Sequence, residues 1–214
     1  MCFEFLNFVN WLNDKNKRLI NSICVFCASS KNVNPFFLDS AFKLGSELAK
    51  MNIDIIYGGG KVGLMGRLSD GALANRGKVI GFIPEFMVAK EWGRDDIDEL
   101  NVVETIHLRE SKLIHSADAI IALPGGIGTM EELLQALAWK FLGIIDKPVY
   151  IINLDGYYDD LLRMMEKSIS EKFMGEAFTI SWKVFNSIDE VLTEIKSVNE
   201  SNKFSDFIPD QNLT

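Results

Sequence analysis

Short apolar segments alternate along the chain with longer segments that repeat apolar residues at helical spacing, and this alternation restricts the fold more than any other feature. Continuous apolar runs of about four to eight residues are typical of buried parallel strands, and apolar residues three and four positions apart are typical of amphipathic helices. The sequence therefore predicts strands at Ile23–Cys27, Ile53–Tyr57, Val79–Ile83, Val102–Thr105, Ala119–Leu123, Val149–Asn153 and Phe178–Ser181. Helices are predicted between them at Phe37–Lys50, Leu64–Asn75, Leu108–Ser116, Met130–Leu142, Tyr157–Glu171 and Asp189–Ser197.

Such an alternation predicts an α/β fold, a doubly wound, Rossmann-like parallel sheet with helices on both faces. A length of 214 residues with 48% hydrophobic and 24% charged residues fits one compact domain. We expect an N-terminal extension over residues 1–20 with the apolar spacing of a short helix, one domain over 21–197, and a flexible polar tail over 198–214. Ligands of such sheets bind beyond the carboxyl ends of the strands, so the functional site is expected at that edge.

A glycine-rich segment follows the predicted strand at Ala119–Leu123 and leads into the next predicted helix. Glycine permits positive φ and lets a ligand approach the backbone, and the free N–H groups at a helix start attract an anion. A phosphate is the ligand that this combination favours. The residues expected to bind it are Gly125, Gly126, Gly128 and Thr129.

Two adjacent carboxylates, Glu131 and Glu132, follow this segment and fall in the first turn of the helix predicted from Met130. One acid in a first turn is explained by the helix dipole. A second acid beside an anion site indicates that at least one of them takes part in chemistry.

Further candidate residues follow other predicted strands and can converge on the same edge of the sheet. They are Ser29, the turn over 58–60, Glu91 and Arg109. Because arginine pairs well with phosphate and carboxylate groups, Arg109 can contact either the ligand or a catalytic acid.

These motifs resemble the LOG (Lonely Guy) family, also labelled lysine decarboxylase-like proteins. The family signature P-G-G-x-G-T-x-x-E is matched over 124–132, and the segments 57–66, 79–84 and 155–158 also resemble that family. The resemblance extends from about Ile23 to Ile195. One motif departs from it, since the M-x-x-R-K-x-x-M pattern is present over 106–113 with Glu110 in place of the lysine.

The resemblance implies hydrolysis of the N-glycosidic bond of a purine nucleoside 5′-monophosphate, of the cytokinin type or AMP, to free base and ribose 5-phosphate. It implies catalytic roles for Glu132 and Arg109 and a homodimer, and we expect no cofactor and a cytoplasmic location. A carboxylate suits this reaction because it can stabilise an oxocarbenium-like sugar and orient water. The expected substrate-binding residues are Ser29, Gly59, Gly60, Glu91, Gly125, Gly126, Gly128, Thr129 and Glu131, with Glu131 holding ribose hydroxyls.

Two other functions remain open on the residues alone. Gly58-x-Gly60-x-x-Gly63 matches the fingerprint of nicotinamide-dependent oxidoreductases, although these glycines follow the second predicted strand and the fingerprint usually follows the first. A nucleotide-binding protein without catalysis is the second alternative. A pyridoxal enzyme is disfavoured, because nothing marks Lys61, Lys112 or Lys140 for a Schiff base.

The net charge and the cysteines indicate which classes of partner and cofactor are not expected. A net charge of −8 argues against nucleic acid, and no segment is long and apolar enough to predict a membrane span. Cys24 and Cys27 form a C-x-x-C within a predicted strand, where a separation of three places the two side chains on opposite faces, so a redox pair is not expected. The odd cysteine count suits a reducing cytoplasm, and neither His107 nor His115 has metal-site neighbours, so no metal is expected.

Overall fold

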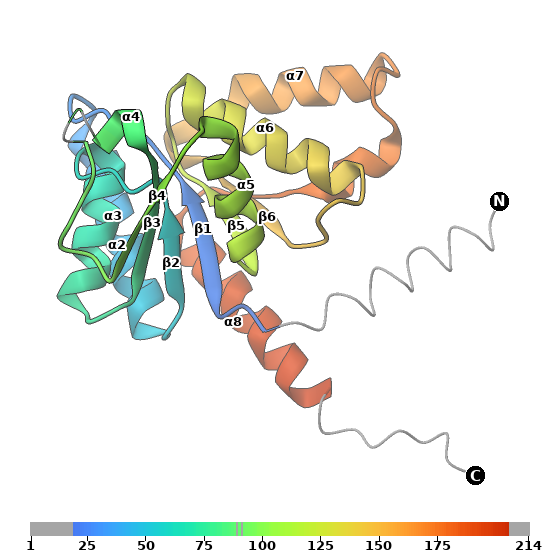
Figure 1. Cartoon of the computed structure of the whole chain (residues 1–214). Coiled ribbons are helices and arrows are strands. Elements are labelled where there is room, and N and C mark those ends of the chain that lie inside the picture. Colours follow the sequence, from blue (N-terminus) through green and yellow to red (C-terminus); the bar gives the residue numbers. More distant parts are fainter. Residues whose placement is uncertain (1–18, 89, 91, 206–214) are drawn as a thin grey trace, which may run out of the picture.

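Seven parallel strands form one sheet in the part of the chain that the structure describes, residues 19–88, 90 and 92–205 of a computed structural model (Figure 1). The strands are β1 (Ser22–Phe26), β2 (Asp54–Tyr57), β3 (Val79–Pro84), β4 (Glu99–Val103), β5 (Ala119–Ala122), β6 (Val149–Ile152) and β7 (Lys183–Phe185). They lie in the order β4-β3-β2-β1-β5-β6-β7, and every neighbouring pair is parallel. The predicted doubly wound α/β fold is confirmed.

Helices cover both faces of the sheet and define two hydrophobic cores. The helices are α2 (Pro35–Lys50), α3 (Gly63–Ala74), α4 (Glu85–Val88), α5 (Ile106–Ser116), α6 (Ile127–Phe141), α7 (Asp159–Ser170) and α8 (Ile188–Ser205), with 3₁₀ turns η1 (Leu154–Gly156) and η2 (Glu176–Ser181). One core lies between the sheet and α2, α3 and α8, and the other lies between the sheet and α5, α6 and α7 (Figure 1). Among the described residues, none of these helices combines the length and the apolar sequence needed to cross a bilayer.

The two cysteines of the C-x-x-C lie in different cores. Cys24 is buried with the residues under α5 and α6, whereas Cys27 is buried on the side of α2 and α3. Both are free thiols, as the predicted strand alternation requires. Burial raises the pKa of both thiols, so neither is a ready thiolate nucleophile.

The prediction of a seventh strand at Phe178–Ser181 is wrong. These residues belong to the 3₁₀ turn η2, and the edge strand β7 follows at Lys183–Phe185. The ring of Phe178 packs edge-on against Phe141 and Trp182, with centroid distances of 5.3 and 5.2 Å. The apolar side chain of Phe178 therefore fills a core contact at a turn and does not take part in strand pairing.

The predicted helix end at Ser197 is also wrong, because α8 continues to Ser205 and includes the first residues of the expected tail. The added turns are held by Asn199, whose Oδ1 accepts from the backbone N–H of Ile20 at 2.7 Å and whose Nδ2 donates to the Ile20 carbonyl at 3.0 Å. A local apolar pattern cannot reveal this contact between residues so distant in sequence. Residues 1–18 and 206–214 lie outside the described residues, so the helical extension and the flexible tail stay predictions there.

The strand order changes direction between β1 and β5, and this junction positions the functional edge. From β1 the chain adds β2, β3 and β4 on one side, and then β5, β6 and β7 on the other. The segments after β1 and β5 meet there, since Leu123 N–H donates to the Phe26 carbonyl at 2.9 Å and Ala28 N–H donates to the Pro124 carbonyl at 3.3 Å. Doubly wound sheets bind their ligands at such a reversal.

Candidate active site

A buried ion pair joins α5 to α6 near the carboxyl edge of the sheet. The guanidinium Nη1 of Arg109 donates to Oε1 of Glu132 at 2.7 Å. The side chains of the two residues are only 7% and 6% exposed. The structure thus brings together the two residues predicted to be catalytic, although they come from different helices.

The environment of Glu132 opposes its ionisation. Burial raises the pKa of this carboxyl above its ordinary value, while the charge and hydrogen bond of Arg109 act in the other direction and the charge of Glu131 raises it further. A carboxyl group so balanced can be ionised beside a cation and can also accept a proton.

Arg109 is oriented by the backbone of β3, which the sequence analysis did not single out, and by the turn after β2, which it did. Its Nε donates to the backbone carbonyl of Phe82 in β3 at 3.0 Å. Its Nη2 lies against Gly58, where an added Cβ would be 2.1 Å from that nitrogen. Glycine at position 58 is therefore needed for the approach of the guanidinium, and the glycine-rich turn after β2 was the available signal.

Helix α6 begins at Ile127 and not at the predicted Met130. Gly126 is the N-cap and Gly128 lies within the first turn, so the helix includes part of the glycine-rich segment. Glu131 and Glu132 consequently lie in the second turn, where the dipole effect has largely fallen off, and the prediction of a first-turn position is wrong. Dipole complementarity explains these acids less well than the sequence suggested.

The first turn of α6 presents an open backbone. Gly126 and Gly128 are exposed, and an added Cβ at either position would have nothing within 4 Å. Gly126 has a φ of −80°, so its role is space for a ligand and not an unusual backbone conformation. Because Gly126 also lacks a side chain that could cap the helix, N–H groups of this turn are free to bind an anion.

Gly125 and Thr129 form the packed side of the same turn. Both are buried, and an added Cβ at Gly125 would lie 2.1 Å from Thr129 Oγ1. The Tyr157 hydroxyl donates to the Gly125 carbonyl at 2.6 Å, and the Tyr158 hydroxyl donates to the Leu123 carbonyl at 2.7 Å. These tyrosines support the loop from behind, and the family-like segment 155–158 was the sequence signal for them.

The remaining predicted site residues take different positions. Ser29 is exposed after β1. Gly59 and Gly60 are buried: Gly59 has a φ of +74°, and a Cβ at Gly60 would lie 2.8 Å from the sulfur of Met65. Both glycines therefore lie in contact with other residues of the chain. Glu91 lies outside the described residues, so its role stays a prediction.

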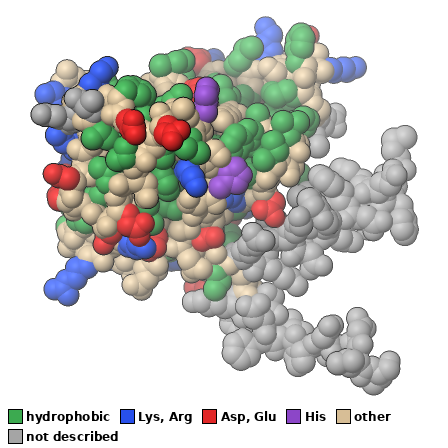
Figure 2. Space-filling model, viewed as in Figure 1, with side chains coloured by type: hydrophobic (Ala, Val, Ile, Leu, Met, Phe, Trp, Pro, Cys, Tyr) green, Lys and Arg blue, Asp and Glu red, His purple; other side chains and the backbone are tan. Residues whose placement is uncertain are grey.

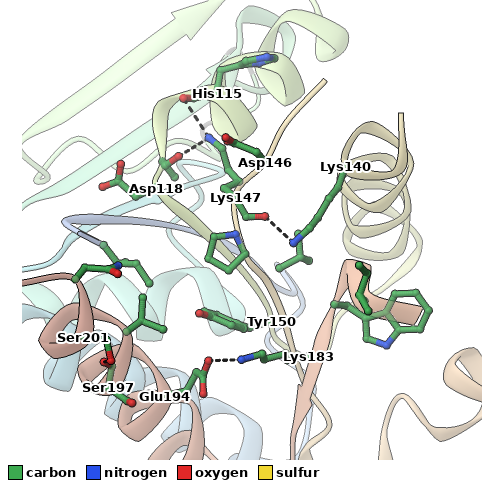
Figure 3. A pocket seen from close by; sticks show the side chains of 18 of the residues that line it. His115, Asp118, Lys140, Asp146, Lys147, Tyr150, Lys183, Glu194, Ser197 and Ser201 are labelled. Carbon is green, nitrogen blue, oxygen red and sulfur yellow. Dashed lines mark hydrogen bonds and ion pairs between the residues drawn. The ribbon is translucent and has the colours of Figure 1, made fainter. Parts of the chain in front are cut away.

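A cavity of about 480 Å³ lies at the opposite edge of the sheet, at the amino ends of β5, β6 and β7 (Figure 3). Lys140, Asp146, Tyr150 and Trp182 are among its lining residues. Burial lowers the pKa of Lys140 to about 8, and its Nζ donates to the Lys147 carbonyl at 3.0 Å. This cavity is separate from the Arg109–Glu132 pair. Within the described part of the chain, no group of three or more His, Cys, Asp or Glu side chains is arranged to hold a metal ion.

Comparison with known sequences gives one consistent family. A family model described as "Possible lysine decarboxylase" matches residues 65–195. A protein of Oryza sativa subsp. japonica named as a probable cytokinin riboside 5′-monophosphate phosphoribohydrolase is 47% identical over 153 residues, which are 71% of this chain and 61% of that protein. An Arabidopsis thaliana protein named cytokinin riboside 5′-monophosphate phosphoribohydrolase is 43% identical over 158 residues, 74% of each chain. The match thus spans less than two thirds of the length of the rice relative.

Solved structures share the fold. The molybdenum cofactor binding protein from Rippkaea orientalis is 26% identical, with a TM-score of 0.64 over 85% of this chain and 98% of that one. The molybdenum cofactor carrier protein from Chlamydomonas reinhardtii is 20% identical, with a TM-score of 0.62 over 85% and 98% of the two chains. The second likeness concerns the fold alone.

Proposed function

The chain belongs to the family described as possible lysine decarboxylases, which includes the plant LOG proteins, and from this membership we propose that it hydrolyses the N-glycosidic bond of a purine nucleoside 5′-monophosphate. The products are the free base and ribose 5-phosphate. The relatives' names support a cytokinin riboside 5′-monophosphate as substrate, and AMP is the alternative without the isoprenoid group.

The observation that carries this proposal is the buried pair of Arg109 on α5 and Glu132 on α6, the helix whose first turn is open. The 5′-phosphate binds the N–H groups of the turn from Gly126 to Thr129, and the sugar then extends towards the acids of the second turn. As the bond to the base breaks, positive charge develops on the ribose, and the Glu132 carboxylate stabilises it and orients water. Arg109 keeps Glu132 ionised despite its burial, and Glu131 holds the ribose hydroxyls.

The two alternatives explain the geometry less well. An oxidoreductase would use the glycines after β2 for a dinucleotide, but Gly59 and Gly60 are buried, and a Cβ at Gly63 would lie 2.5 Å from the Ser30 carbonyl oxygen. These glycines are used for contacts within the chain. A binding protein without catalysis would not require a buried carboxyl with a raised pKa beside the anion site, since such a group costs stability.

The test is to incubate the purified protein with AMP, a cytokinin riboside 5′-monophosphate and the matching nucleosides, and to measure free base by chromatography. We expect base release from at least one monophosphate and a far lower rate from its nucleoside, because the phosphate anchors the reacting sugar. Ribose 5-phosphate should inhibit competitively. Equal rates for nucleoside and nucleotide would contradict the phosphate site, and bound nucleotide that stays intact would favour the binding protein.

We also propose a homodimer formed through the exposed apolar surface of α6 and its C-terminal end. Leu134, Phe141, Leu142 and Ile144 are 44%, 52%, 67% and 55% exposed. Figure 2 shows hydrophobic side chains gathered over this part of the molecule. An apolar surface of this kind marks an interface, and a second copy of the chain is the partner that the family resemblance implies. A cytoplasmic location is supported by the buried free thiols of Cys24 and Cys27.

A further inference from the structure

A second contact between α5 and α6 lies beside the Arg109–Glu132 pair and joins two acids. Glu110 follows Arg109 on α5, Glu131 precedes Glu132 on α6, and the carboxyl groups of Glu110 and Glu131 lie within hydrogen-bonding reach of each other. Glu110 is only 3% exposed. Two ionised carboxylates have no hydrogen to donate, so this contact is a hydrogen bond only if one of the two acids holds a proton.

The groups around Glu110 provide little stabilisation for its ionised form. Within the described part of the chain, Glu110 Oε2 is buried without a hydrogen-bond partner. Among the described residues, the group that pairs with this oxygen is the exposed imidazole of His107, whose Nδ1 is 3.8 Å away and which is charged only when protonated. A buried carboxylate oxygen without a donor is costly, and the cost falls when the carboxyl is neutral.

The charges that face this cluster from neighbouring elements favour the same state. The titratable groups that interact with Glu110 or Glu132 are Arg109 and His107 on α5, Glu131 on α6, Cys24 and Cys27 at β1, and Tyr158 after β6. The thiols and the phenol are neutral, since burial raises the pKa of each. Three ionised glutamates would therefore face the guanidinium of Arg109, and like charges so close together cannot all ionise freely.

We propose that Glu110 keeps a proton and donates it to the Glu131 carboxylate across α5 and α6, as a shared proton, and that its release as the pH rises weakens binding of a phosphate-bearing substrate at the neighbouring first turn of α6. Glu110 is then a positioning residue that acts through Glu131. Burial, followed by the charge of Glu131, raises the pKa of Glu110, whereas His107 lowers it. The second half of the proposal rests on the proposed function, and the first half does not.

Thermal unfolding of Glu110→Gln against wild type tests the shared proton without any substrate. The amide is neutral at every pH and can donate to Glu131 as the shared proton does. A carboxyl whose pKa is raised by folding stabilises the fold fully below its unfolded pKa of about 4.3 and loses that stabilisation as the pH rises through the folded pKa. We therefore expect similar midpoints for the two proteins near pH ~4, and a midpoint for Glu110→Gln about 2–4 °C above wild type near pH ~8.

Substrate binding tests the second half. The KM of wild type for the nucleoside monophosphate should rise about three- to tenfold as the pair loses its proton, because an added negative charge repels the phosphate. Over the same pH range the KM of Glu110→Gln should stay flat, and kcat should change little. Glu104→Gln removes the same charge from an exposed position just before α5 and should keep the wild-type profile.

The outcomes separate the two claims. A midpoint difference between wild type and Glu110→Gln that is the same at all pH values, or that favours wild type at high pH, would overturn the shared proton. A pH-dependent midpoint difference with identical KM profiles would overturn the effect on binding and keep the shared proton. If no nucleoside monophosphate is hydrolysed at all, the proposed function fails, and the unfolding result still decides the first claim.

Discussion

At the scale of single residues, Arg109 and Glu132 depend on each other, because each charge is nearly removed from water and is balanced by its partner at 2.7 Å. Removing one member of a buried ion pair leaves an uncompensated charge, which usually costs about 3–5 kcal/mol. Substitutions at this pair therefore affect both chemistry and stability, and the two effects have to be measured separately.

Glu132→Gln is expected to lower turnover at least about a hundredfold, because the neutral amide cannot stabilise the positive sugar or activate water. The amide oxygen can still accept from Arg109, so we expect a loss of only about 1–3 kcal/mol in the free energy of unfolding. Steady-state base release and urea unfolding measure the two effects. Turnover equal to wild type would return Glu132 to a purely structural role.

The pH dependence of the reaction follows from the same burial. Because burial raises the pKa of Glu132, kcat/KM should fall on the acid side at a pH above the ordinary glutamate value of about 4.3. Activity is lost as the pH decreases through the raised pKa, since the ionised form acts. A pH–rate profile measures this limb. A profile that stays flat down to the ordinary value would contradict the role of an ionised Glu132.

Arg109→Lys is expected to restore little of what Arg109→Ala loses. The guanidinium donates Nε to the Phe82 carbonyl and Nη1 to Glu132 in a fixed fork, and an ammonium group cannot reproduce both directions. Both variants should lose turnover, and the alanine variant should also lose about 3–5 kcal/mol of stability because Glu132 stays buried without its cation. Kinetics and unfolding of the two variants provide the comparison. Wild-type kinetics in the lysine variant would show that the two fixed N–H directions of the guanidinium are not needed.

At the scale of elements, the glycines at the start of α6 have two distinct tasks. Gly125 is packed against the Thr129 side chain, whereas Gly126 and Gly128 have open space where a Cβ would stand. Packing inside the protein explains the first glycine, and access for a ligand explains the other two.

This difference yields a matched pair of variants. Gly125→Ala should lose about 1–3 kcal/mol of stability, since its Cβ would meet Thr129 Oγ1 at 2.1 Å. Gly128→Ala should keep the wild-type stability, because nothing lies near the added methyl group, but it should raise the KM for the nucleotide or the inhibition constant of ribose 5-phosphate. Unfolding and inhibition assays measure the two variants. A Gly128→Ala protein with unchanged phosphate binding would argue against a phosphate site at this turn.

Sequence patterns predicted the elements well where the pattern is local. The strands at β1, β2, β3, β5 and β6 and the side-chain alternation of Cys24 and Cys27 follow from a period of two and from continuous apolar runs. The prediction of a strand at Phe178–Ser181 was wrong because the apolar ring of Phe178 packs against Phe141 from a 3₁₀ turn. The predicted end of α8 was wrong because a hydrogen bond between Asn199 and the backbone of Ile20 holds the helix beyond Ser197.

The candidate site was also predictable only where the signal is local in the sequence. Arg109 and Glu132 were selected by motif resemblance, and their contact needed the packing of two helices, which no one-dimensional pattern contains. The hydrogen bonds of Arg109 to the Phe82 carbonyl and of Tyr158 to the Leu123 carbonyl join residues far apart in the sequence, so no periodic pattern of residues predicts them. The buried state of Glu110 was hidden because a charged residue on a helix is ordinarily exposed.

At the scale of the whole molecule, the proposed homodimer depends on the apolar surface around the C-terminal end of α6. A stable dimer needs an interface of about 1,200–2,000 Å² in total, and exposed large hydrophobic residues contribute most where they gather in one patch. Leu142, at 67% exposure, lies at the end of this helix and packs little in its own subunit.

Leu142→Asp is expected to convert the dimer to a monomer while leaving the subunit folded, because the charge would be buried only in the interface. Sedimentation velocity of the variant and wild type measures the mass of each, and circular dichroism checks the fold. Met164→Asp is a matched control on α7, since Met164 is 61% exposed outside the α6 surface. A wild-type protein that sediments as a monomer would exclude the homodimer.

Arg109 also has a mechanical consequence for the molecule. Its Nε binds β3, on one side of the β1–β5 junction, and its Nη1 binds α6, which follows β5 on the other side. The same guanidinium therefore links elements that lie on the two sides of the β1–β5 junction. When this link is removed, the β1–β5 ladder still joins the two sides, and we expect the elements around Arg109 to open locally at a lower cost in free energy.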